Sequence, residues 1–203
     1  MNRASSIAIL ILLGAFGAGM TYLAQHSSAP RIAAEQRLID SRNLLDLLPP
    51  DSYDNQPLEQ PLTLENTALG NSTLLAGFRA TKAGKPYAVL LRSQTPGYAG
   101  AIVLLIAIDE NARLIGVKTL KQTETPGLGA RIADWPNTWL ESFTGKSRSN
   151  PDDKGWALKK DRGQFDQMAG ATITSRAVIN ATHDALRYFD DHRQQLLGSA
   201  PHE

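Results

Sequence analysis

The pattern of hydrophobic and polar positions begins with one long apolar segment near the amino terminus. Residues Ile7–Ala24 read IAILILLGAFGAGMTYLA and carry no charged side chain. A helix of this length spans about 27 Å, close to the roughly 30 Å hydrocarbon core of a bilayer. The segment therefore predicts a transmembrane anchor. A cleaved signal peptide, with small residues at Ser27–Ala29, and a buried core helix are the alternatives.

The charges beside this segment predict its orientation. Arg3 and the amino terminus precede it, and no acidic residue lies near. The positive-inside rule then leaves the amino terminus in the cytoplasm and the rest of the chain outside. We expect a single-pass protein of the inner membrane with a periplasmic domain. Its parts are a cytoplasmic end at 1–6, the anchor at 7–24, a helix with an extended connector at 25–70, and one domain at 71–203.

Helical and alternating patterns follow the anchor. Residues 31–50 repeat apolar positions at mostly helical spacing and end at Pro49-Pro50, and residues 51–70 look like an extended loop. Two hairpins are predicted next, at 73–93 and 99–122. The strand at 101–109 is apolar on both faces, which is typical of an internal strand covered on both sides.

Two helices complete the predicted elements. A short one follows Pro136, and a long closing one starts near Ser175 or Arg176, with a buried stripe that includes Val178 and Phe189. The order of helix, hairpins and helices predicts an α+β fold with a mainly antiparallel sheet flanked by helices.

Composition excludes several kinds of chemistry. The 203 residues carry a net charge of +1, which gives no reason to expect nucleic acid as a partner. No cysteine is present, so disulfides, thiolate nucleophiles and cysteine-ligated clusters are excluded. The four histidines show no metal spacing, and no Gly-x-Ser-x-Gly or P-loop occurs. We therefore predict neither a metal site nor catalytic residues of the chain's own.

Hydroxyl side chains cluster where the closing helix begins, in GATITSRAV at 170–178. Thr174 or Ser175 can serve as the helix cap, which leaves Thr172 unexplained. Gly170-Ala171 allow another group to approach the backbone closely. A helix amino terminus also attracts anions. The pattern indicates a phosphate near Thr172, either bound or covalently attached.

The stretch FDQMAGATITSRAV resembles the flavinylation motif of the FMN-binding domain family. The motif is Ser/Thr-Gly-Ala-Thr with an aspartate a few residues before it. The resemblance implies that FMN is joined through a phosphoester to Thr172, with Asp166 as the upstream aspartate. Ala169 departs from the pattern and supplies no hydroxyl for a hydrogen bond to the phosphate or to the modifying enzyme.

A second stretch, TETPGLG at 123–129, resembles the other signature of this family. Pro126-Gly127 predicts a tight turn with a positive φ at the glycine. PGYAG at 96–100 also looks like the family, which places Tyr98 near the flavin ring. The residues expected to bind FMN are Thr172 together with Gly170, Ala171, Thr174, Ser175, Glu124, Thr125, Gly127, Leu128, Gly129 and Tyr98.

The resemblance covers most of the chain, including WALKKDRGQFDQ at 156–167, and implies a function in electron transfer. The family includes the G subunit of the Rnf complex, which couples ferredoxin and NAD oxidoreduction to ion movement, and the C subunit of the sodium-pumping NADH:quinone oxidoreductase. An anchor with a small exported domain is more similar to the former. The implied partners are other membrane subunits and a flavin transferase. The competing hypotheses are the C subunit, an anchored binding module without redox activity, and a structural component with a decayed motif.

Overall fold

The computed structural model describes residues 12–14, 16–17, 19–20, 46–59, 61–64 and 67–198. The chain divides into two units, Met1–Asn43 and Leu44–Glu203. In the first unit, the described residues are helical and exposed. No helix within the described ranges is long and apolar enough to cross a membrane. Most of the predicted anchor, and residues 31–45 of the helix predicted at 31–50, lie outside the described residues. Residues 46–48 form a turn or bend instead of the predicted helix.

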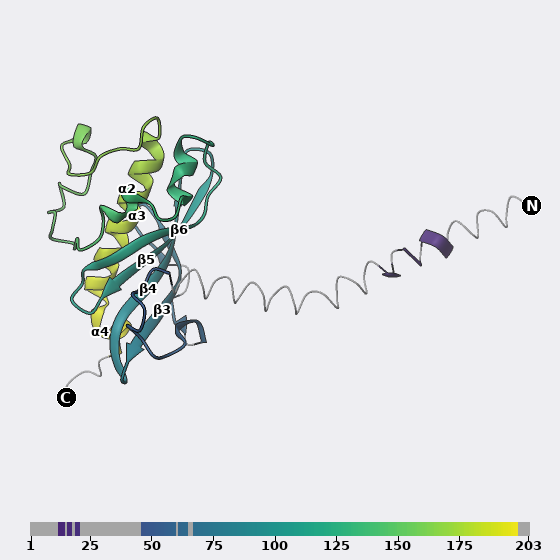
Figure 1. Cartoon of the computed structure of the whole chain (residues 1–203), viewed down its shortest axis with the longest axis horizontal. Helices are drawn as coiled ribbons and strands as arrows, with labels where there is room; N and C mark the ends of the chain where they lie inside the picture. Colours follow the sequence, from purple (N-terminus) through teal and green to yellow (C-terminus); the bar gives the residue numbers. More distant parts are fainter. Residues whose placement is uncertain are drawn as a thin grey trace, which may run out of the picture. The chain divides into compact units, whose positions relative to one another are not determined.

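The second unit is built on an antiparallel sheet of six strands (Figure 1). Its long strands are β3 (Thr73–Lys82), β4 (Lys85–Pro96), β5 (Ala101–Asp109) and β6 (Leu114–Lys121). The strand order is β1-β3-β4-β5-β6, and β2 also pairs with β3. Both predicted hairpins and the α+β class are therefore confirmed.

Residues 51–70 contain more structure than predicted. The described part of this region includes η1 (Pro57–Glu59), β1 (Pro61–Leu62) and β2 (Thr67–Ala68). Both short strands pair with β3, so that Pro61 lies opposite Phe78 and Thr67 lies opposite Leu74. Because strands of two residues leave no alternating pattern in the sequence, this region reads as an extended loop until the pairing with β3 is seen.

Among the described residues of the second unit, every helix other than η1 lies after β6. They are η2 (Gly129–Ala133), α2 (Thr138–Glu141), η3 (Lys159–Asp161), α3 (Thr172–Asp191) and α4 (Arg193–Leu197). The short helix after Pro136 is confirmed as α2. The predicted closing helix is two helices, because His192 leaves the helical conformation with φ −120° and ψ 20°. Its predicted start near Ser175 is also wrong, since α3 begins at Thr172.

The core lies on both faces of β5, as its pattern predicts. On one face, Leu104 packs with Val178 and Phe189 of α3 in the larger apolar cluster. On the other face, Leu105 packs with Leu47 in a smaller cluster. Helix α3 runs along the sheet (Figure 1). Because the apolar stripe of α3 packs on the sheet, the first turn of this helix is held in a fixed position relative to the ends of the strands.

Candidate functional site

Three segments that are distant in the sequence meet around one cavity of about 480 Å³. They are the loop between β4 and β5, the loop after β6, and the first turn of α3. The lining includes most of the residues predicted to bind FMN: Tyr98, Glu124, Thr125, Leu128, Gly129, Gly170, Ala171, Thr172 and Thr174. Gly127 and Ser175 are not part of that lining. Ile173 also lines the cavity and is not among the predicted residues.

Glu124 joins the three segments. Its side chain is buried, and one carboxylate oxygen accepts a 2.9 Å hydrogen bond from the backbone N–H of Ala99. The other oxygen accepts a hydrogen bond from the hydroxyl of Thr174. Because a buried carboxylate is stable only when it is hydrogen-bonded, these contacts hold the two loops and the start of α3 together. Both carboxylate oxygens are thus engaged by the protein.

The loop after β6 contains the predicted turn. The N–H of Leu128 donates to the carbonyl of Thr125 at 3.1 Å, and Gly127 has φ +76°. These are the features of a type II turn, so the prediction of a positive φ is confirmed. A Cβ on Gly127 would meet no atom within 4 Å, whereas one on Gly129 would lie 2.6 Å from Thr174 Oγ1. The protein's own packing therefore requires a glycine at 129.

The hydroxyls at the start of α3 have different environments. Thr174 and Ser175 are buried. Ser175 donates to the carbonyl of Ala171 at 2.8 Å and accepts from the N–H of Met168 at 3.0 Å. The cap position is Ala171, without a side-chain cap. The predicted capping by Thr174 or Ser175 is therefore wrong, because both hydroxyls are used in buried tertiary or local contacts.

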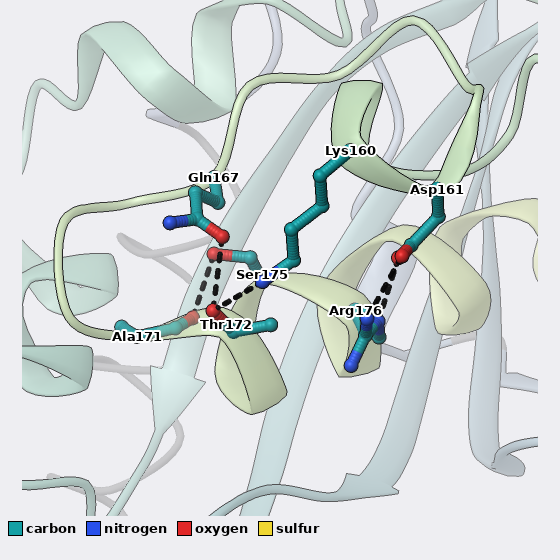
Figure 2. Close-up of polar contacts among 7 residues, drawn as sticks. All are labelled: Lys160, Asp161, Gln167, Ala171, Thr172, Ser175 and Arg176. Carbon is teal, nitrogen blue, oxygen red and sulfur yellow. Dashed lines mark hydrogen bonds and ion pairs between the residues drawn. The ribbon is translucent and has the colours of Figure 1, made fainter.

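Thr172 differs from Thr174 and Ser175 because it is only half-buried. Its hydroxyl donates to Gln167 Oε1 at 2.9 Å and accepts from Lys160 Nζ at 2.9 Å (Figure 2). The amide and the ammonium group thus hold a hydroxyl that lines the cavity. Lys160 and Gln167 are not among the predicted site residues. Both lie in the stretch at 156–167 that resembles the family, but spacing does not indicate which of its side chains reach Thr172.

An ion pair between η3 and α3 lies on one side of this hydroxyl (Figure 2). Arg176 donates two hydrogen bonds to Asp161, at 2.8 and 3.0 Å (Figure 2). The Arg176 guanidinium lowers the pKa of the Asp161 carboxyl, mainly through this hydrogen bonding, and Asp161 raises the pKa of Arg176 in the same way. Both groups therefore remain ionised around neutral pH.

The two remaining motif positions lie outside the cavity lining. Asp166 is exposed and forms a 2.7 Å ion pair with Lys159. Its carbonyl accepts a 2.7 Å hydrogen bond from the indole of Trp139. Ala169, which replaces the Ser/Thr of the motif, lines a different cavity of about 340 Å³ next to Trp139 and Met168.

The cavity suits a ligand with both a phosphate and an aromatic ring. Its volume falls within the range of roughly 300–1,000 Å³ that is usual for small-molecule sites. Lys160 and the amino terminus of α3 favour negative charge at Thr172. Tyr98, Leu128 and Ile173 are 69%, 43% and 49% exposed and offer apolar contacts. The residues present therefore fit a flavin nucleotide.

Comparison with known proteins agrees with this class of site, since residues 97–187 match the family described as FMN-binding domain. The G subunit of the ion-translocating oxidoreductase complex of Pseudomonas aeruginosa strain UCBPP-PA14 is 46% identical over 207 residues, which cover 100% of this chain and 96% of that protein. The corresponding G subunit of Shewanella loihica is 38% identical, covering 92% of this chain and 90% of that protein. The chain belongs to the family of G subunits of ion-translocating oxidoreductase complexes.

A solved structure is also similar. The crystal structure of NqrC from Shewanella oneidensis is 27% identical and has a TM-score of 0.47. The matched part covers 61% of this chain and 61% of that chain.

Proposed function

We propose that this chain is the electron-transfer component of a membrane-bound, ion-translocating redox complex of the Rnf type, with FMN attached to Thr172 through a phosphoester. Membership in the G-subunit family supports the type of complex. One observation carries the attachment site: Thr172 and Thr174 both line the cavity, but Thr172 is half-buried, whereas Thr174 and Ser175 are buried. An enzyme can reach the first hydroxyl without opening the core.

The proposed attachment conserves atoms and needs no oxidant. Thr172 Oγ1 forms a bond to the FMN phosphorus of a flavin adenine dinucleotide donor. The pyrophosphate bond of the donor breaks, AMP leaves, and the hydroxyl proton passes to a base of the flavin transferase. The mass added to the protein is that of FMN less one water.

Once FMN is bound, it supplies the one-electron transfer chemistry. The chain's own residues bind and orient the cofactor. Thr172 carries the tether, and Gly170 and Ala171 leave room beside it. Tyr98 and Leu128 would contact the ring. The proposed partners are the other membrane subunits and the flavin transferase, and the complex would couple ferredoxin and NAD oxidoreduction to ion movement.

Mass spectrometry of the full chain, expressed with a flavin transferase, tests the proposal. We expect one FMN less one water per chain, a yellow colour that survives denaturation, and a modified peptide that contains Thr172. A colourless, unmodified protein that nevertheless assembles with membrane subunits would instead support a binding or structural role.

We propose further that Ile7–Ala24 anchors the chain in the inner membrane, with residues 1–6 in the cytoplasm and residues 71–203 in the periplasm. The uncharged segment after Arg3 supports this topology. A carboxy-terminal alkaline phosphatase fusion is expected to be active, and the mature protein is expected to retain its amino-terminal peptide. Recovery of a soluble periplasmic form that begins at Pro30 would contradict the anchor and favour a signal peptide.

A further inference from the structure

The three side chains of η3 each contact the segment that contains Thr172. Lys159 pairs with Asp166 at 2.7 Å, Lys160 donates to the hydroxyl of Thr172 at 2.9 Å, and Asp161 accepts from Arg176. Figure 2 shows the last two of these contacts from η3 to the first turns of α3. This short helix therefore lies directly beside the attachment site.

The backbone that carries Lys160 is held on the core. Leu158 and Phe165 flank η3 and are 1% and 2% exposed. The N–H of Lys159 donates to the carbonyl of Phe165 at 2.8 Å, and the N–H of Phe165 donates to the carbonyl of Ala157 at 3.1 Å. A Cβ on Gly163 would collide with the backbone of Ala157, so the loop closes as tightly as it does only with a glycine there. Although the Lys160 side chain is exposed, its point of attachment is therefore fixed.

The cations near Thr172 differ in whether they form an ion pair with a carboxylate. The positive charge of Arg176 is balanced by Asp161, and that of Lys159 is balanced by Asp166. Lys160 instead donates to an uncharged hydroxyl, and its charge adds only the last contribution, after that of Arg176, to the lowered pKa of Asp161. It is therefore the cation of η3 whose contact lies at Thr172 itself, where a phosphoester would place a negative charge.

We propose that Lys160 binds the phosphoryl group at Thr172, both while the ester forms and after it has formed, and that Gln167 orients the hydroxyl beforehand. This inference rests on the proposed attachment of FMN to Thr172. Esterification converts Thr172 Oγ1 into a weak acceptor, while the unbridged phosphoryl oxygens share one negative charge. The ammonium group then gains a charge-assisted hydrogen bond, which is stronger than the one it makes to the hydroxyl. Gln167 Oε1 accepts from the hydroxyl and so holds one orientation before the phosphorus–oxygen bond forms.

The test compares lysine variants of the full chain during attachment of FMN by the flavin transferase with flavin adenine dinucleotide. Lys160→Met keeps most of the side chain but removes the charge, and we expect it to slow attachment on the order of tenfold. Lys160→Arg restores the charge and is expected to recover most of the rate. Lys154→Met is the matched control, because Lys154 is an exposed lysine earlier in the same loop; its rate is expected to equal that of the wild type.

A second measurement does not depend on the rate or on electron transfer. The phosphorus-31 resonance of the attached phosphodiester is expected to move in Lys160→Met and to stay in place in Lys154→Met, since only the former removes a ligand of the phosphoryl group. Equal rates and equal resonances in wild type and Lys160→Met would overturn the role of Lys160 while leaving attachment at Thr172 intact. Absence of FMN from the wild-type chain would instead contradict the proposed function. Thermal unfolding of the unmodified variants should match the wild type, because the Lys160 side chain is exposed.

Discussion

Thr172→Val protein, expressed with the flavin transferase, is expected to be colourless and to carry no covalent FMN. Valine keeps the shape of threonine and removes the hydroxyl that accepts from Lys160 and donates to Gln167. Since both of those partners are exposed, the free energy of unfolding is expected to fall by less than about 1 kcal/mol. Intact mass and urea unfolding of the unmodified protein measure the two effects separately.

Thr174→Val is the matched control for this change, because it removes a neighbouring hydroxyl from the same turn. It leaves the buried carboxylate of Glu124 without one donor. The free energy of unfolding is therefore expected to fall by about 1–3 kcal/mol. The label is nevertheless expected to remain on Thr172. A Thr172→Val protein that acquires FMN on Thr174 would mean that this first turn of α3 opens during attachment and that the assigned residue is wrong.

The parts of the fold that the sequence predicts are those with local causes. The apolar run at 101–109 has both faces buried as an internal strand because successive side chains point to opposite sides. The turn at Pro126-Gly127 follows from the fixed φ of proline and the freedom of glycine at positive φ. The family motifs likewise indicate three segments of one site, although they do not state how these segments meet.

The parts that the sequence does not predict depend on contacts between distant residues. Thr174 and Glu124 are 50 positions apart, so the local pattern favours a capping role that the fold replaces with a buried hydrogen bond. The predicted start of α3, near Ser175 rather than at Thr172, is wrong for the same reason. Lys160 reaches Thr172 because its loop closes on the core, and no spacing between the two residues predicts that contact.

The largest change expected in the cavity itself comes from Gly129→Val. A Cβ at this position would lie 2.6 Å from Thr174 Oγ1 and 2.7 Å from Glu124 Oε2. Both groups are buried, so the Glu124 carboxylate must move away from Thr174. We expect the free energy of unfolding to fall by about 1–3 kcal/mol, because a buried charge loses its partner. Urea unfolding of the unmodified protein measures this loss.

The same change is expected to separate attachment of FMN from the environment of its ring. Lys160 and Gln167 belong to other segments, so covalent FMN should remain on Thr172. The ring would lie beside a loop that Glu124 no longer holds, and its absorption spectrum and midpoint potential should shift.

Gly127→Asn is the control for Gly129→Val, because a Cβ there meets no atom within 4 Å and asparagine tolerates a positive φ better than other residues. We expect this variant to keep the spectrum and the potential of the wild type, since residue 127 is not part of the cavity lining. If Gly129→Val also retained the wild-type stability, spectrum and potential, the loop after β6 would be only a turn. The ring would then have to be held by another segment, with that of Tyr98 as the next candidate.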